Sequence, residues 1–125
     1  MIFDDIKQKA NTGALVLAIV PNAYSLYHMF LQEKSVSFDG RNHLLNFSDK
    51  TLKAIFEQSG FEVIHLDTVL TGIDNIKKQI QWLNPYSKSS GERYLNQKIL
   101  SDFINEKYIL DNNLGLRLRV LAKLK

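Results

Sequence analysis

The chain of 125 residues contains no cysteine, which excludes disulfides, zinc–thiolate sites and cysteine nucleophiles. It also lacks an apolar run of the roughly 20 residues that a membrane-spanning helix needs. Its longest such run, Ala14 to Pro21, has only the length of a strand. The start of the chain, MIFDDIKQKA, carries acidic residues where a secretory signal has lysines. We therefore expect a cytoplasmic protein without a membrane partner.

Sequence motifs for the common chemistries of enzymes are also absent. No serine lies in a nucleophile elbow, and no phosphate loop is present. None of the three histidines lies on a predicted helix with a carboxylate at the three- or four-residue spacing of metal ligands. The sequence therefore predicts no metal site, and it assigns a catalytic role to no residue.

The charge balance is mildly basic, with a formal net charge of +3. The basic residues are scattered except at the end of the chain, where Arg117, Arg119, Lys123 and Lys125 gather. Nucleic-acid-binding surfaces combine such clusters with interleaved aromatic residues, and these are missing here. We therefore expect a solvated basic face and no nucleic-acid partner. Weak nucleic-acid binding is the least favoured function.

The first part of the chain has the pattern of a helix followed by a buried strand. Apolar residues at helical spacing predict a helix over residues 2–10, and Gly13 is typical of the turn that ends one. Residues 14–20 are continuously apolar and rich in β-branched side chains, which predicts a strand covered on both faces. Pro21 ends this strand because proline cannot donate to a sheet ladder. A short helix is predicted over residues 23–32.

A well-capped helix is predicted in the middle of the chain, after a long loop over residues 33–46. Ser48 is a suitable N-cap, since its side-chain oxygen can accept an amide hydrogen of the first turn. Phe47 and Leu52 occupy the two positions of a hydrophobic staple. Gly60 is expected to terminate this helix, and a strand follows it directly.

The strand after this helix, residues 61–66, and a last strand, residues 116–124, enclose a helical region. Apolar spacing predicts helices over residues 73–83 and 92–108. The last strand alternates apolar with basic residues, which is typical of a strand with one dry face. The order of elements is helix, strand, loop, helix, strand, two helices and strand. This order predicts an α/β fold, formed as a single domain over residues 1–125.

Three stretches of the sequence resemble a known family. The first is GALVLAIVPN, a glycine turn and a strand with a proline-asparagine exit; the second is HLLNFSDKTLKAIFEQSGFEVI, and the third is RVLAKLK at the end. In this order they resemble the fifth strand, the following helix with the sixth strand, and the last strand of class I S-adenosylmethionine-dependent methyltransferases. The resemblance covers residues 1–66 and about 114–125. Residues 73–110 lie where the family carries a variable helical insertion between the last two strands.

This resemblance implies the C-terminal part of a Rossmann-like methyltransferase sheet, with about three strands, the last one antiparallel, and four to five helices. The family binds S-adenosylmethionine with a glycine-rich turn in its N-terminal half. No two of the six glycines in this chain lie within three residues of each other. The resemblance thus implies the substrate-side half of an enzyme acting on a small-molecule methyl acceptor, with no cofactor-binding residues and no activity alone. A truncated chain, a split subunit and a degenerate relative all stay open.

Three residues are candidates for binding the methyl acceptor. The resemblance implies that His43 lies on the substrate side of the sheet, as a base or a hydrogen-bonding group, although anchoring of its loop is the favoured alternative. Asn22 and Tyr24 follow the fifth strand at its carboxyl end, where α/β sheets bind ligands. Asn22 is equally suited to cap the next helix. His28 and His65 are expected on the surface.

The expected partners follow from the edge of the sheet. The family places its fifth strand between the fourth and the last, so without a fourth strand Leu15 to Val20 would be an exposed apolar edge. Such edges pair with another chain or aggregate. We therefore expect a homodimer or association with a missing N-terminal half. The alternative function is a non-catalytic dimerisation or regulatory module, because the cofactor site is missing.

Overall fold

The computed structural model describes residues 2–32, 35, 45–76 and 104–125. The elements within these ranges are α1 (Ile2–Lys9), β1 (Leu15–Pro21), α2 (Leu26–Leu31), α3 (Asp49–Gln58), β2 (Phe61–Val69), α6 (Glu106–Asp111) and β3 (Arg117–Leu124). A further helical stretch covers Ile73–Ile76, at the limit of the described residues. The protein therefore has the predicted α/β fold class, and each predicted strand is present.

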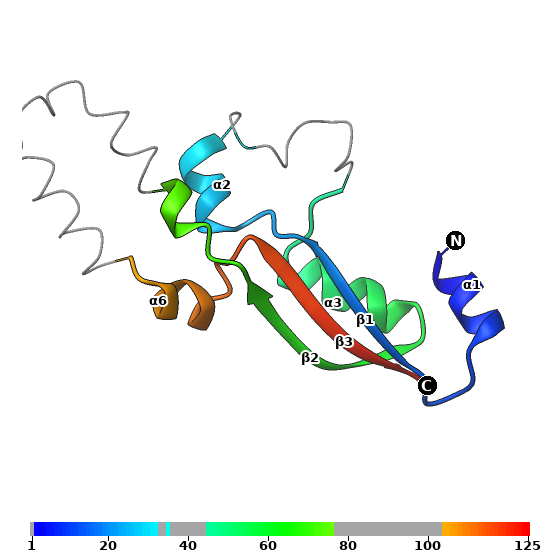
Figure 1. Ribbon diagram of the computed structural model, residues 1–125. Coiled ribbons are helices and arrows are strands. Elements are labelled where there is room, and N and C mark those ends of the chain that lie inside the picture. The colour runs from blue at the N-terminus through cyan, green and yellow to red at the C-terminus, as the bar shows by residue number, and fades with distance from the viewer. Residues whose placement is uncertain (1, 33–34, 36–44, 77–103) are drawn as a thin grey trace, which may run out of the picture.

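The three strands form one sheet in the order β1-β3-β2, so the last strand of the chain lies in the middle (Figure 1). β3 pairs antiparallel with both neighbours, and β1 and β2 consequently run in the same direction. The central position of β3 explains why Leu118, Val120 and Ala122 are fully buried. The alternation predicted for this strand is confirmed.

One face of the sheet carries the main hydrophobic core, which α3 and α1 cover (Figure 1). Leu52 and Phe56 of α3 pack on Phe61, the first residue of β2. Phe3 of α1 contacts the two other phenyl rings at centroid distances of 5.0 and 5.6 Å. The even-numbered side chains of β1 reach the same core. The side of α3 that carries Leu52 and Phe56 is thus buried against a single layer of strands, and Phe3 and Ile6 of α1 are partly buried there.

The opposite face of β1 is open to solvent. Leu15, Leu17 and Ile19 are 63%, 63% and 56% exposed, so the prediction of a strand covered on both faces is wrong. The reason is that α1 and α3 both pack on the side of the sheet that faces the core. On this open face Arg119 of β3 donates from Nε to Oδ1 of Asp67 on β2, at 2.9 Å. A cross-strand ion pair thus takes the place of an apolar layer there.

The predicted start and end of α3 are confirmed. Ser48 Oγ accepts a hydrogen bond from Thr51 N–H at 3.1 Å, and Thr51 Oγ1 accepts one from Ser48 N–H at 2.9 Å. This reciprocal pair is a capping box. Gly60 follows the helix with a φ of +91°, a conformation that glycine adopts without a steric penalty.

The prediction of a helix over residues 92–108 is wrong at the C-terminal end of that range, which is the part that the structure describes. Asn105 has extended backbone angles, and its Oδ1 accepts from Tyr108 N–H at 2.8 Å. Asparagine competes for backbone groups in this way, so it favours a helix cap over a helix interior, and α6 begins only at the next residue. The rest of that helix, most of the helix predicted over 73–83 and most of the loop over 33–46 lie outside the described residues.

Candidate functional site

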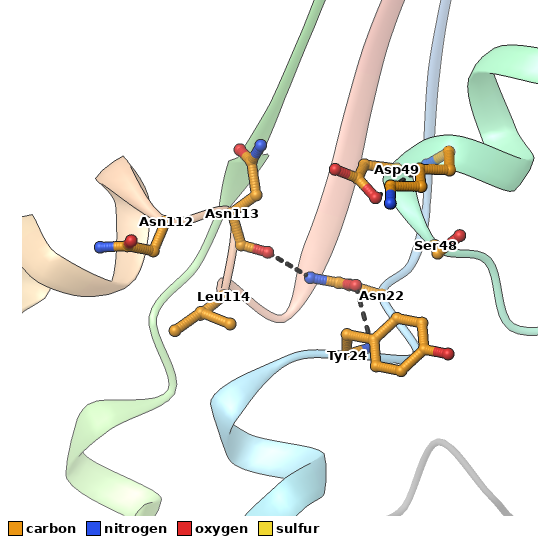
Figure 2. A pocket seen from close by; sticks show the side chains of 8 residues that line it. Asn22, Tyr24, Ser48, Asp49, Asn112, Asn113 and Leu114 are labelled. Atoms are coloured by element: carbon orange, nitrogen blue, oxygen red, sulfur yellow. Dashed lines mark hydrogen bonds between the residues drawn. The ribbon is translucent and has the colours of Figure 1, made fainter.

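A pocket of about 330 Å³ opens at the carboxyl end of β1 (Figure 2). Three segments form it: the exit of β1, the first turn of α3 and the turn that precedes β3. The residues that line it are Asn22, Tyr24, Ser48, Asp49, Lys50, Asn112, Asn113 and Leu114. In open α/β sheets, ligands bind beyond the carboxyl ends of the strands. This pocket is therefore the candidate functional site, and it contains two of the three predicted residues.

The sheet and one bridge bring these three segments together. Because β3 lies beside β1, the turn before β3 faces the exit of β1. A parallel bridge joins Asn22 to Phe47, in which Phe47 N–H donates to Pro21 O at 3.3 Å and Ala23 N–H donates to Phe47 O at 2.8 Å. This bridge fixes the first turn of α3 next to the strand exit.

Asn22 joins two of the segments that form the pocket by side-chain hydrogen bonds. Its Nδ2 donates to the carbonyl oxygen of Asn113 at 2.9 Å, and its Oδ1 accepts from Tyr24 N–H at 3.1 Å (Figure 2). Nδ2 also donates to the carbonyl oxygen of Gly115 at 2.8 Å. The residue is 1% exposed, and one acceptor position on Oδ1 is left. The idea that Asn22 caps the next helix is wrong, because Ser25 is the N-cap of α2. Asn22 instead links the exit of β1 to the turn before β3.

The groups that face the pocket opening come from Tyr24 and from the start of α3. The Tyr24 side chain is 63% exposed, so its phenol is accessible to a ligand. Asp49 Oδ1 accepts from Lys50 N–H at 2.8 Å, while the Oγ of Ser48 is engaged in the capping box. The residues that line this space therefore supply a phenol, a carboxylate and an ammonium group, together with the apolar side chain of Leu114. Such a set can orient a polar molecule by hydrogen bonds and charge.

Neither of the two described histidines, His28 and His65, lines this pocket. His43 lies outside the described residues. His28 is 3% exposed, and its Nδ1 lies 2.6 Å from Ser35 Oγ, so the expectation of a surface position is wrong. The reason is that α2 packs its Tyr27 and Leu31 side into a second apolar cluster with Ile76, which leaves His28 covered.

His65 is exposed, as expected, and lies on β2, away from the residues that line the pocket. Its Nε2 is 3.2 Å from Oδ2 of Asp67. The hydrogen-bonded Arg119 guanidinium holds the pKa of the Asp67 carboxyl below its ordinary value of 3.8, and the hydrogen bond from His65 lowers this pKa further. These three residues tie β2 to β3 on the open face, so we assign them a structural role.

The sequence interpretation missed the contribution of Asp49, Lys50 and residues 112–114. Their local structures were predictable, since Ser48 marks a helix start and residues 112–115 have the composition of a turn. Asn113 indeed has a φ of +56°, which asparagine tolerates better than most residues. No local signal indicates that these two segments meet the exit of β1, because the pairing of β3 with β1 places the turn there and the Asn22–Phe47 bridge places the start of α3 there.

Comparisons with known proteins identify no relative, so the function is inferred from the fold and the geometry of the pocket. No model of a known protein family matches the chain, and no curated protein matches it. Among residues 2–32, 35, 45–76 and 104–125, no three or more His, Asp or Glu side chains gather where they could hold a metal ion. No helix in these ranges combines the length and the apolar character needed to cross a membrane.

Proposed function

We propose that this chain forms the substrate-side half of a Rossmann-like, S-adenosylmethionine-dependent methyltransferase. The observation that carries the proposal is the sheet, in which two strands of the same direction flank an antiparallel strand that comes last in the chain. The family likewise has its fifth strand beside an antiparallel last strand. β1, β2 and β3 would then be its fifth, sixth and last strands. The proline-asparagine exit of β1 and the Gly60-Phe61 turn before β2 agree with this assignment.

In this proposal the pocket at the end of β1 receives the methyl acceptor. The phenol of Tyr24, the carboxylate of Asp49 and the ammonium group of Lys50 suit a small polar molecule that carries hydroxyl or amine groups. The contribution of these side chains is to hold the acceptor atom in line with the methyl group. A base is needed only where the acceptor must lose a proton, and His43 is the candidate for it.

The exit of β1, as the structure describes it, does not fit the cofactor itself. A glycine-rich turn binds a ligand because its backbone N–H groups are free to approach it. At the exit of β1 the N–H groups of residues 22–25 all donate to acceptors within the chain, and Pro21 has none. We therefore expect S-adenosylmethionine to bind a different polypeptide segment, and the 125-residue chain to be inactive alone.

Isothermal titration calorimetry with S-adenosylmethionine and S-adenosylhomocysteine tests the proposal. The 125-residue chain is expected to give no binding heat. The polypeptide extended upstream of Met1 in the same reading frame is expected to bind both ligands. Failure of that extended polypeptide to bind would remove the methyltransferase assignment. Micromolar binding by the 125-residue chain alone would show that the fit argument is wrong, since a cofactor site would then exist within it.

A second candidate function is a non-catalytic dimerisation or regulatory module. The observation that favours it is the open edge of β1, with its row of exposed apolar side chains. The reading frame upstream of Met1 discriminates the two functions. An in-frame segment that encodes a glycine-rich turn favours the methyltransferase, and a frame that stops there favours the module.

A further inference from the structure

The hydrogen bonds of the β1–β3 ladder show which side of β1 is engaged. Leu124 N–H donates to Ala14 O at 2.9 Å at one end, and Asn22 N–H donates to Leu116 O at 3.1 Å at the other. In an antiparallel pair, every second residue exchanges hydrogen bonds with its partner. The even-numbered residues of β1 therefore bond to β3. The odd-numbered residues, Leu15, Leu17 and Ile19, point their N–H and C=O groups toward the outer edge of the sheet.

The same three residues carry the exposed side chains of β1. Leu15, Leu17 and Ile19 are each more than half exposed, and residues 15–20 include no charge. Natural edge strands are usually protected by charged residues, bulges or covering elements. β2, the other edge strand, follows this rule, since it carries Glu62, His65 and Asp67 and has a register shift. Within the part of the chain that the structure describes, the edge of β1 therefore differs from that of β2 in offering both unpaired backbone groups and an apolar stripe.

Both ends of this edge are closed. Beyond Ile19, Pro21 has no N–H group, and its carbonyl oxygen accepts from Phe47 N–H. Before Leu15, Gly13 N–H donates to Leu124 O at 2.8 Å. The available edge is consequently limited to three outward-facing residues, at equal spacing along the strand.

We propose that this edge pairs with the same edge of a second copy of the chain, antiparallel, with the two-fold axis at Leu17. Leu17 then faces Leu17 of the second copy, and Leu15 faces Ile19 of the second copy. This register uses all outward-facing groups of both strands, in about six hydrogen bonds, two for each pair. A shift of the register in one direction places Leu15 opposite Pro21, and a shift in the other places Ile19 opposite Gly13, so either shift loses hydrogen bonds.

The properties of the β1 edge favour a second copy of the chain as its partner. A two-fold interface must be self-complementary, because every contact from one copy to the other is repeated with the two copies exchanged. The sequence Leu15-Val-Leu-Ala-Ile19 meets this condition in the proposed register, since apolar residues face apolar residues at every position and no like charges oppose each other. The pairing joins two three-stranded sheets into one of six strands, and it brings the exposed leucine and isoleucine side chains into one continuous stripe.

This pairing does not depend on methyltransferase activity. In a complete enzyme of the proposed type a further strand would occupy the edge, so the paired state belongs to the 125-residue chain on its own. Cofactor titration therefore tests the methyltransferase assignment, whereas cross-linking and sedimentation test the pairing of β1 edges.

Site-directed cross-linking tests the register, because the chain has no natural cysteine. In the proposed dimer the Cα atoms of the two Leu17→Cys residues are about 5.5 Å apart, within the range of a disulfide. Oxidation with diamide, which takes up the two thiol hydrogens, is expected to give a cross-linked dimer. Leu15→Cys and Ile19→Cys are the matched controls. Each lies about 14 Å from its own counterpart, so neither should cross-link alone, whereas an equimolar mixture of the two should.

Sedimentation equilibrium gives the independent test. The unmodified chain should dimerise with rising concentration, Leu17→Lys should be monomeric with an unchanged circular dichroism spectrum, and Ile64→Lys, an exposed position on β2, should still dimerise. A monomeric unmodified chain at millimolar concentration overturns the proposal. Cross-linking of Leu15→Cys alone as efficient as that of Leu17→Cys overturns it as well, since the register would be wrong. A dimer that persists in Leu17→Lys assigns the interface to another surface or to a different strand.

Discussion

Replacing Asn22 by alanine should destabilise the fold far more than its small size suggests. The substitution removes three hydrogen bonds, to Asn113 O, to Gly115 O and from Tyr24 N–H. A hydrogen bond contributes about 1 kcal/mol net, and a buried acceptor left without a donor costs about 1–3 kcal/mol. Because the bond to Gly115 O is buried and the other two are partly buried, we expect a loss of about 3 kcal/mol. That is a large share of the roughly 5–15 kcal/mol by which domains are stable.

Urea unfolding followed by far-ultraviolet circular dichroism measures this loss. The midpoint should fall while the slope of free energy against urea stays unchanged, and all variants should be compared at one protein concentration because association adds to apparent stability. Tyr24→Ala is the matched control. It keeps the backbone N–H that donates to Asn22 and truncates a side chain that is 63% exposed, so we expect a change within about 0.5 kcal/mol.

Asn22→Asp sharpens the test. The carboxylate keeps the acceptor for Tyr24 N–H but replaces both donors with an oxygen that faces two carbonyl oxygens. It should therefore be at least as unstable as Asn22→Ala at neutral pH, and partly recover in acid, where a protonated carboxyl group donates one bond. If Asn22→Ala lies within about 0.5 kcal/mol of the unmodified chain, the structural role assigned to Asn22 is refuted.

Substitutions at four further positions test the supporting structure. Ser48→Ala should cost about 1 kcal/mol in urea unfolding by removing the cap of α3, and Ser48→Asp should restore most of it. Phe61→Ala should cost about 3–5 kcal/mol because the side chain is fully buried, and a value below 1 would contradict the assigned core. Gly60→Ala should cost about 1–2 kcal/mol through its φ of +91° alone, since no atom lies near the added methyl group. The ion pair with Arg119 lowers the pKa of Asp67 in the folded state, so its stabilisation is present above the unfolded-state pKa and lost as the pH falls through the folded-state pKa. Asp67→Asn should flatten the acid limb of the stability–pH curve, and an unchanged limb would show that the pair contributes nothing.

The elements of the fold could be predicted from the sequence because their signals are local. The cap at Ser48 and the glycine after α3 are fixed by backbone hydrogen bonding and by φ, which involve neighbours within a few residues. The alternation of apolar and basic residues in β3 directly indicates which of its side chains are buried. The prediction of one helix over residues 92–108 is wrong at Asn105. The asparagine side chain bonds to a backbone N–H as a helix cap there, and the spacing of apolar residues carries no information about such caps.

The exposure of β1 and the burial of His28 could not be predicted from local signals. A continuously apolar strand such as Leu15–Val20 has the composition of a strand covered on both faces, and only the positions of α1 and α3 on one side of the sheet leave half of it open. His28 is polar, and it is buried because α2 packs on residues distant in sequence. Burial depends on which elements pack on which face, and composition cannot specify this.

The sequence by itself determined the α/β class, the strands, the cap of α3 and the position of Asn22 and Tyr24 at a strand end. The tertiary structure decided that Asn22 is a structural link, that Asp49, Lys50 and residues 112–114 complete its pocket, and that three odd-numbered residues of β1 form an open edge. The physical reason is the range of the interactions. Capping, turns and alternation act between near neighbours, whereas the antiparallel insertion of β3 between β1 and β2 joins segments about 50 to 100 residues apart.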